Sequence, residues 1–189
     1  MDERIKLVEV ETLSKDWGTL TRATLDYRRT DGTWQTQTRE VYDHGNAAAI
    51  ILFDPARRTV LLLRQYRYPV SLNGDPAWLI ECCAGLLDGD DKLEGVMREA
   101  LEETGHQPRD VQFLFDAYMS PGSLTERLSC FVGHYDAGTK IHDGGGLVAE
   151  GEEIELLELD LQEALALIAS GGIIDAKTIM LLHWLALNR

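Results

Sequence analysis

Cysteine is scarce in this chain, and the positions of the few cysteines exclude two kinds of site. Only three of the 189 residues are cysteine: the adjacent pair Cys82 and Cys83, and Cys130. A disulfide between neighbouring cysteines is geometrically awkward, and none of the spacings typical of zinc sites is present. The sequence therefore predicts buried, reduced thiols and a cytoplasmic protein.

Positive charge and long apolar runs are lacking as well. Lysine and arginine number 18 against 32 aspartates and glutamates, which gives a formal net charge of −14. So acidic a surface argues against nucleic acid or an anionic membrane as a partner. No apolar run approaches the roughly 20 residues needed to cross a bilayer. The charged first residues, Met1 to Arg4, predict no signal peptide.

What is present is enough for a globular domain with a core. Hydrophobic residues make up 44% of the chain and charged residues 26%, which is ordinary for such a domain. The first 45 residues read as extended segments around Asp31-Gly32, a strong hairpin signal. A hairpin with so many polar side chains is not expected to stand alone. We therefore predict a β extension at 1–45 that packs on the main domain or on a second subunit.

From residue 46 onward, strands and helices alternate, which predicts an α/β layered domain at 46–189. The expected strands cover residues 47–53, 59–68, 78–83, 111–118, 127–135 and 154–159. The expected helices cover residues 91–104, 161–169 and 175–187, and the last two are judged from their apolar spacing.

The most informative segment runs from Gly85 to Gly105. Its core, Arg98-Glu99-Ala-Leu-Glu102-Glu103-Thr-Gly105, places three carboxylates at i, i+3 and i+4. These positions share one helix face, where like charges repel each other. A divalent cation such as Mg²⁺ would remove the repulsion, because it binds carboxylate oxygens and often bridges them to substrate phosphates.

The acidic face has a second explanation, a solvated surface of the helix. Three features favour the metal site, and one of them is Gly105, which fits a C-terminal stop of the helix. A glycine loop enters the helix, and acids stand at the helix start, where free N–H groups and the helix dipole favour anions. These acids are Asp88, Asp90 and Asp91.

The segment resembles the Nudix box, the family pattern G-x5-E-x7-R-E-U-x-E-E-x-G-U, in which U is a bulky aliphatic residue. The match is specific from Arg98 to Gly105, although His106 stands where the family has an aliphatic residue. The chain is also one residue shorter between the glycine and the arginine. The family's first glutamate is replaced by Asp91, or by Asp90 if the gap falls earlier, so the role of this acid stays open.

The resemblance implies a Nudix fold, an α/β/α sandwich with a mixed sheet, preceded here by an N-terminal antiparallel β-hairpin. It implies Glu99 and Glu103 as metal ligands, together with the backbone carbonyl of Ala84. It also implies that Arg98 fixes a glutamate through a bidentate ion pair, for which the guanidinium fork is suited. Mg²⁺ is the expected cofactor, with Mn²⁺ as a substitute.

Motifs outside the box narrow the resemblance to the ADP-ribose pyrophosphatase branch of the family, and within it to the bacterial GDP-mannose pyrophosphatase group. Their order along the chain carries this resemblance. The motifs are Arg39-Glu40-Val-Tyr-Asp-His-Gly45, Arg64-Gln-Tyr-Arg67, Glu81-Cys-Cys-Ala-Gly-Leu-Leu87, Tyr118-Met-Ser-Pro-Gly122, Gly144-Gly-Gly146 with its acids, and Asp175-Ala-Lys177-Thr178.

The narrower resemblance implies a set of substrate-binding residues. Trp17 stands where the group has an aromatic residue near the substrate, and the other members contact the nucleotide sugar or its phosphates. These are Arg39, Glu40, Arg67, Leu86 and Lys177. Without the resemblance, Arg39 and Arg67 would read as solvated strand residues and Trp17 as a packing residue or an interface anchor. Lys177 at a helix start opposes the dipole preference, which favours an anionic partner.

The resemblance also implies catalytic acids besides Glu103. Glu126 lies close to the reacting phosphates. Glu152 is a further metal ligand or positions the attacking water, and Glu150 or Glu153 could take that role because the loop is longer here. Apart from the family, these acids would read as surface residues.

The expected activity is Mg²⁺-dependent hydrolysis of the pyrophosphate bond of a nucleoside diphosphate sugar. GDP-mannose, giving GMP and mannose 1-phosphate, is the first choice, and ADP-ribose is the alternative. A non-hydrolytic nucleotide-sugar sensor on a Nudix scaffold is the alternative from another class, and the presence of Glu99, Glu102 and Glu103 argues against it. We expect a homodimer joined through the N-terminal strands, with Trp17, Arg39 and Glu40 serving the partner's site.

Overall fold

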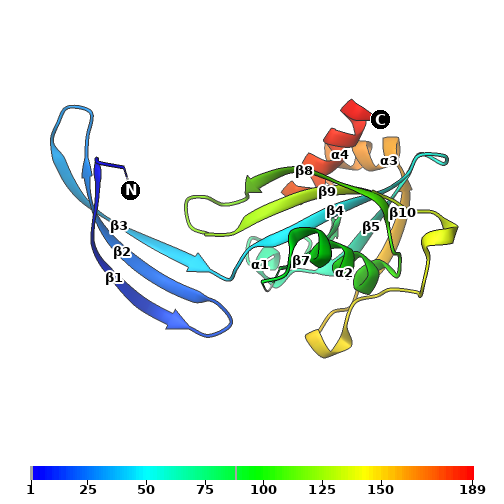
Figure 1. Cartoon of the computed structure of the whole chain (residues 1–189), viewed down its shortest axis with the longest axis horizontal. Helices are drawn as coiled ribbons and strands as arrows, with labels where there is room; N and C mark the ends of the chain where they lie inside the picture. Colours follow the sequence, from blue (N-terminus) through cyan, green and yellow to red (C-terminus); the bar gives the residue numbers. More distant parts are fainter. Residues whose placement is uncertain (1, 88) are drawn as a thin grey trace. The chain divides into compact units, whose positions relative to one another are not determined.

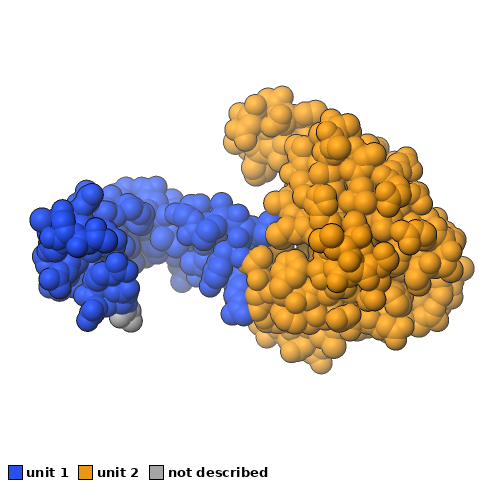
Figure 2. Space-filling view, turned by 90° about the horizontal axis from the view of Figure 1, so that it is seen from above, with its two compact units in different colours: residues 1–46, 118–127 blue, residues 47–117, 128–189 orange. Residues whose placement is uncertain are grey.

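The computed structural model describes residues 2–87 and 89–189, with Glu150 described by its backbone alone. The expectations that concern Asp88 and the side chain of Glu150 therefore lie outside the described residues. The chain divides into two compact units, residues 1–46 with 118–127 and residues 47–117 with 128–189 (Figure 2). None of the described helices is long and apolar enough to cross a membrane.

The first unit is a three-stranded antiparallel sheet in the order β1 (Ile5–Lys15), β2 (Thr19–Arg28) and β3 (Trp34–Asp43) (Figure 1). The predicted hairpin is β2–β3, and Gly32 in its turn adopts a φ of 88°, a backbone conformation that glycine allows. The structure adds β1 to this hairpin. None of the described residues of this unit is buried, so the sheet has no core of its own.

Residues 118–127 belong to the first unit because they are hydrogen-bonded to the end of β3. The Tyr42 N–H donates to the Ser123 carbonyl at 2.8 Å, and the Thr125 N–H donates to the Tyr42 carbonyl at 3.1 Å. The Thr125 hydroxyl donates to the Asp43 carboxylate at 2.7 Å. These bonds fix the segment that carries Glu126.

The second unit is built on a mixed seven-stranded sheet. Its main path runs β10 (Glu155–Asp160), β5 (Thr59–Tyr66), β4 (Ala47–Asp54), β9 (Arg127–His134) and β8 (Arg109–Tyr118). Two short strands complete it: β6 (Trp78–Glu81) pairs with β5, and β7 (Cys83–Leu86) pairs with β4. β4 and β9 are parallel, whereas β4 and β5 are antiparallel. Every residue of β4 is buried, so this strand is the centre of the core.

Helices cover both faces of this sheet (Figure 1). On one face lies α2 (Lys92–Thr104), and on the other lie α3 (Leu161–Ser170) and α4 (Ala176–Asn188). The single turn α1 (Tyr68–Ser71) follows β5, and the 3-10 turns η1 (Ala137–Thr139) and η2 (Val148–Glu150) lie in the loops before β10. The predicted α/β/α sandwich with a mixed sheet is confirmed.

Helix α2 matches the predicted helix at 91–104 because both of its ends carry the local signals. Asp91 caps its start, and Gly105 ends it in the left-handed conformation with a φ of 72°.

The predicted strand at 78–83 differs from the structure, which interrupts it at Cys82. The Cys82 N–H donates to the Thr178 hydroxyl at 2.7 Å instead of to a strand. The three cysteines are free and buried, as predicted.

Candidate active site

Helix α2 holds two glutamates against strand β7. Glu103 is only 1% exposed, and its carboxylate accepts a hydrogen bond from the Ala84 N–H at 3.1 Å. The Glu99 carboxylate lies over Gly85, where an added Cβ would come within 2.1 Å of Glu99 Cδ. Only glycine leaves this space, because it has no Cβ. Gly85, the first glycine of the box, therefore lets the Glu99 carboxylate lie close to strand β7.

The backbone carbonyl of Ala84 lies with these carboxylates. In an extended strand, the N–H and C=O of one residue point to the same edge. Because the Ala84 N–H points to Glu103, its carbonyl faces the same side. The structure thus brings together the three groups that the resemblance implies as metal ligands, Glu99, Glu103 and the Ala84 carbonyl.

The two carboxylates are short of positive charge. Burial raises the pKa of Glu99 to about 7, with Glu102 and Glu152 adding repulsion and Arg98 opposing the rise. Burial likewise raises the pKa of Glu103 to about 8, and the charge of Glu99 adds to the effect although the Cys83 thiol and the Ala84 N–H lower it. A cation at this point would stabilise the ionised form of both groups.

The donor set fits a hard divalent cation by its chemistry. Among the described residues, no three His, Cys, Asp or Glu side chains gather at one point suited to a metal ion. Two carboxylates and a carbonyl are nevertheless all oxygen donors. Mg²⁺ is usually held by only one or two carboxylates and completes its shell with water and substrate phosphate.

Arg98 contacts the box glutamates in a way that differs from the expected bidentate pair. Its Nη1 is shared between Glu99 at 2.9 Å and Glu102 at 3.1 Å, and its Nη2 donates to the Leu86 carbonyl at 3.4 Å. The two glutamates follow Arg98 at i+1 and i+4 on the helix. Neither of them forms a bidentate pair with the two terminal nitrogens of the guanidinium. Leu86, expected at the substrate, contributes its carbonyl to this contact.

The acids at the start of the box take separate positions. The Asp91 carboxylate accepts a hydrogen bond from the Leu93 N–H at 2.9 Å and caps α2. Asp90 lies 3.6 Å from Nε of Arg98. Asp91 is therefore engaged in capping, which satisfies a free N–H at the helix start, while Asp90 is the acid close to the guanidinium.

A second buried carboxylate lies on the adjacent strand. Glu81, at the end of β6, is 1% exposed and accepts two hydrogen bonds from the Arg67 guanidinium at 2.7 and 2.9 Å. The Lys177 ammonium donates to Glu81 and also to Asp175 at 3.0 Å. Arg67 and Lys177, both expected at the substrate, are thus brought together on one carboxylate.

The pKa of Glu81 moves in the direction opposite to that of Glu103. Burial raises it, but the contacts with Arg67 and Lys177 more than offset burial, so the pKa lies below its ordinary value. Sequence reasoning assigned Glu81 no role. A single acid in the otherwise apolar strand Trp78-Leu-Ile-Glu81 was the signal that could have found it, because buried acids need a partner.

The glycine-rich loop places Glu152 near the box. The Gly145 N–H donates to the backbone carbonyl of Glu103 at 2.8 Å. The Glu152 carboxylate accepts a backbone N–H of its own loop at 2.8 Å, and its charge contributes to the raised pKa of both Glu99 and Glu103. Glu153 is exposed. Of the loop acids whose side chains are described, Glu152 is the one whose charge acts on the box.

The remaining predicted site residues lie in the unit formed by residues 1–46 and 118–127. Trp17 is 71% exposed and stacks on His44 with ring centroids 5.2 Å apart. Glu126 lies 3.8 Å from Nε2 of His44. Arg39 and Glu40 are exposed on β3, and Glu40 pairs with an arginine of β2 at 3.0 Å. Sequence reasoning gave His44 no role, although it stands in the motif that contains Arg39 and Glu40.

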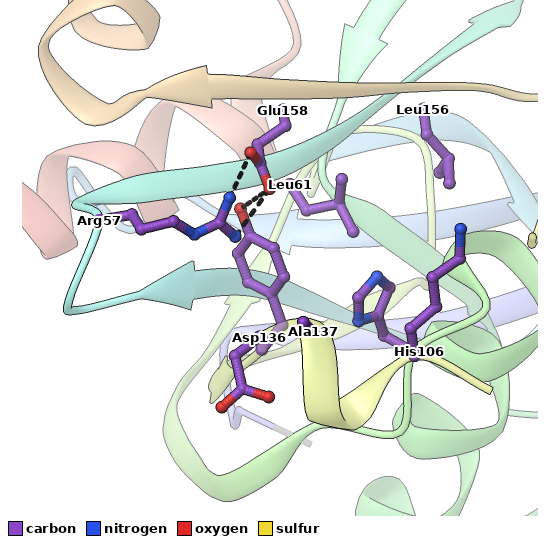
Figure 3. A pocket seen from close by; sticks show the side chains of 9 residues that line it. Arg57, Leu61, His106, Asp136, Ala137, Leu156 and Glu158 are labelled. Carbon is purple, nitrogen blue, oxygen red and sulfur yellow. Dashed lines mark hydrogen bonds and ion pairs between the residues drawn. The ribbon is translucent and has the colours of Figure 1, made fainter.

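A hollow of about 480 Å³ lies elsewhere in the second unit, and none of the predicted site residues lines it (Figure 3). His106, the residue that departs from the box pattern, lies on its wall and meets the Tyr135 ring edge-on, with centroids 5.4 Å apart. The charged groups Arg57 and Glu158 pair with each other there, and the Tyr135 hydroxyl donates to Glu158. Because these charges are already paired, the box and not this hollow is the candidate active site.

Comparison with known proteins gives two family matches that together span nearly the whole chain. The model of the GDP-mannose pyrophosphatase NudK N-terminal domain matches residues 4–42, and that of the NUDIX domain matches residues 43–182. The chain is 48% identical to a GDP-mannose pyrophosphatase of Yersinia enterocolitica over 185 residues, which is 97% of this chain and 96% of the relative. It is 46% identical to that of Pectobacterium atrosepticum, covering 97% and 94% of the two chains.

Among solved structures, the chain is similar to one described as the crystal structure of an ADP compounds hydrolase. The TM-score is 0.71, with coverage of 97% of this chain and 93% of the other. At 19% identity, this likeness bears on the fold alone.

Proposed function

The chain belongs to the Nudix hydrolase family, and we propose that it hydrolyses the pyrophosphate bond of GDP-mannose to GMP and mannose 1-phosphate. The observation that carries the proposal is the pair Glu99 and Glu103, two carboxylates with raised pKa values beside the Ala84 carbonyl. The choice of substrate is supported by the relatives at 46% to 48% identity, which are named GDP-mannose pyrophosphatases.

Nudix hydrolases generally use divalent metal ions, and we propose Mg²⁺ for this one, with Mn²⁺ as a substitute. Glu99, Glu103 and the Ala84 carbonyl would hold it, and Glu152 is a further candidate ligand. Such an ion would neutralise phosphate oxygens and would lower the pKa of the attacking water. Mg²⁺ fits the donor set because every donor is an oxygen.

The residues around the ion have separate proposed roles. Glu152 takes the proton of the attacking water as general base, since it is the loop acid whose charge acts on Glu99 and Glu103. Arg98 keeps Glu99 in place through its ion pair at 2.9 Å. Arg67 and Lys177 contact the substrate as hydrogen-bond donors, and Glu81 holds both of them in place.

We further propose that residues 1–45 act as a dimerisation unit that also contacts the substrate. None of the described residues of its sheet is buried, and Leu7, Val8 and Val10 of β1 are each about half exposed, at 46%, 58% and 53%. A second copy of the chain would cover such a surface, with Trp17, Arg39 and Glu40 serving the partner's site. Light scattering at micromolar concentration checks this, and a monomer mass would refute it.

The first experiment is product analysis by chromatography after incubation with Mg²⁺ and, separately, GDP-mannose and ADP-ribose. GMP should form much faster than AMP, and the Glu103→Gln variant should lose most of this turnover. Glu94→Gln is the matched control, because Glu94 is an exposed acid on the same helix. Faster release of AMP would move the substrate to ADP-ribose. Binding without turnover of either would favour a nucleotide-sugar sensor.

A cytoplasmic location is supported by three free, buried cysteines.

A further inference from the structure

Three segments that are distant in the sequence meet at His44. Trp17, in the turn between β1 and β2, stacks on the His44 ring at 5.2 Å with an interplanar angle of 23°. Glu126 approaches Nε2 of His44 to 3.8 Å from residues 118–127. Tyr42 packs beside the ring at 5.6 Å. All of these residues lie within one compact unit, so the arrangement is internal to it.

The contact is held in place by the backbone around His44. Asp43, the residue before it, accepts hydrogen bonds from the Thr125 hydroxyl at 2.7 Å and from the Gly45 N–H at 3.2 Å. The Arg127 N–H donates to the Asn46 side chain at 3.0 Å. Both neighbours of Glu126 in the sequence are therefore fastened to the segment that carries His44.

His44 also carries a nitrogen that packing alone does not explain. Its side chain is 12% exposed. Its Nδ1 is the one buried side-chain nitrogen or oxygen in the described part of the chain without a hydrogen-bond partner. A buried polar atom left unpaired destabilises the folded state. An aliphatic or phenyl side chain would fill the same place without that cost, so the imidazole calls for a reason beyond filling space.

We propose that His44 is a positioning residue that couples Trp17 to Glu126. Its ring face supports Trp17, a residue that is 71% exposed and free to meet a nucleotide. Its Nε2 lies 3.8 Å from the Glu126 carboxylate and holds that carboxylate in one orientation. The inference rests on the proposed function, because it takes Trp17 and Glu126 to be substrate residues of the pyrophosphatase reaction.

The two contacts of His44 can be removed separately. His44→Phe keeps a flat ring under Trp17 but has no nitrogen facing Glu126. His44→Gln keeps an amide nitrogen at about the position of Nε2 but has no ring. The matched controls are His183→Phe and His183→Gln, because His183 is exposed on α4, in the other unit. Circular dichroism and light scattering would establish that each variant keeps the fold and the assembly of the unmodified protein.

The expected result is a split between kcat and KM for GDP-mannose with Mg²⁺. His44→Phe should lower kcat about 10- to 100-fold, the scale of a catalytic group displaced by about 1 Å, while KM stays within about twofold. His44→Gln should raise KM about two- to tenfold, the scale of one lost aromatic contact, with kcat closer to that of the unmodified protein. The proposal would be overturned if both His44 variants matched the His183 controls. It would also be overturned if each variant changed kcat and KM to the same extent.

A double-mutant cycle tests the route through Glu126. If His44 acts through this carboxylate, adding His44→Phe to Glu126→Gln lowers kcat no further than Glu126→Gln alone. Losses that simply add would overturn the coupling. If His44→Phe fails to fold, a second double-mutant cycle combines His44→Gln with Trp17→Leu. Because His44 is proposed to support Trp17, His44→Gln should not raise KM any further once Trp17 is replaced.

The failure of this inference is distinguishable from failure of the proposed function. An unmodified protein that turns over no nucleotide sugar would overturn both. An unmodified protein that hydrolyses GDP-mannose, with His44 variants equal to their controls, would overturn the role of His44 alone.

Discussion

Glu81 and Glu103 are equally buried glutamates, but their surroundings shift their pKa values in opposite directions. Each is 1% exposed. Glu81 faces Arg67 and Lys177, which more than offset the effect of burial and hold its pKa below the ordinary value. Glu103 lies beside Glu99, whose charge adds to the effect of burial, and its pKa is raised to about 8. Burial therefore does not distinguish a structural carboxylate from a candidate catalytic one, but the local supply of cations does.

The two clusters also differ as whole groups. The Glu81 cluster contains two acids and two bases, Glu81 and Asp175 with Arg67 and Lys177, so its charges balance without a ligand. At the box, a single nitrogen, Nη1 of Arg98, serves both Glu99 and Glu102, and Glu103 adds a third carboxylate. A buried group of uncompensated charges is costly to fold, and such groups concentrate at functional sites. A bound divalent cation would supply the missing charge.

The strongest test of the comparison is Glu103→Gln, which removes the uncompensated charge and retains the shape. We expect kcat for GDP-mannose to fall by at least about 100-fold, the scale at which one charge-stabilising group acts in catalysis. The stability of the metal-free protein at neutral pH should stay equal or rise, because the unfolded state no longer gains free energy by ionising this carboxyl. Steady-state kinetics and urea unfolding measure the two effects, with Glu94→Gln as the control. Near-normal turnover would show that Glu103 is not a ligand.

Glu81→Gln is the opposite change, because it takes the partner away from two cations. We expect the free energy of unfolding to fall by about 3 kcal/mol, as for other buried ion pairs that lose one member. The control is Glu155→Gln, whose pair with Arg64 is exposed and should contribute within about 1 kcal/mol. Urea unfolding of both variants measures the difference. Equal stabilities of the two variants would remove Glu81 from its structural role.

The pH dependence of stability sharpens the contrast further. In the folded, metal-free protein Glu99 and Glu103 keep their protons to about pH 7 and 8, whereas their ordinary pKa is 4.5. Between these values the unfolded state binds fewer protons than the folded state, so stability falls as the pH rises from about 4.5 to 8. We expect the decline to be shallower in Glu103→Gln.

Unfolding curves of chelator-treated protein at several pH values measure this decline. Added Mg²⁺ should stabilise the unmodified protein more at the higher pH, because metal ligands must be ionised. A slope identical in Glu103→Gln and the unmodified protein would contradict the assignment of the raised pKa.

The smallest expected effect concerns Asp91, an acid that belongs to neither cluster. Asp91→Ala should lower the free energy of unfolding by about 1 kcal/mol through loss of the helix cap, and Asp91→Asn should lower it far less, because asparagine caps a helix about as well. Both variants should keep the stabilisation by Mg²⁺ seen in thermal unfolding. Loss of the Mg²⁺ response in Asp91→Asn would instead assign Asp91 to the metal site.

Local features were predicted well because their physics is local. The helix at 91–104, its acidic face and its glycine end follow from the 3.6-residue period and from capping preferences. The Asp31-Gly32 turn follows from the backbone freedom of glycine. These signals need only a few neighbouring residues, so the sequence by itself determined that Glu99 and Glu103 share a face and that β2 and β3 form a hairpin.

The charge partners were decided by the tertiary structure. Glu81 meets Arg67 across 14 residues and Lys177 across 96 residues of sequence, and no periodicity links them. The same holds for His44, which lies between Trp17 and Glu126 because residues 118–127 are hydrogen-bonded to the end of β3. Sheet register and helix docking bring such residues together. The sequence therefore determined which acids stand on one helix, and only the fold decided which of them are neutralised.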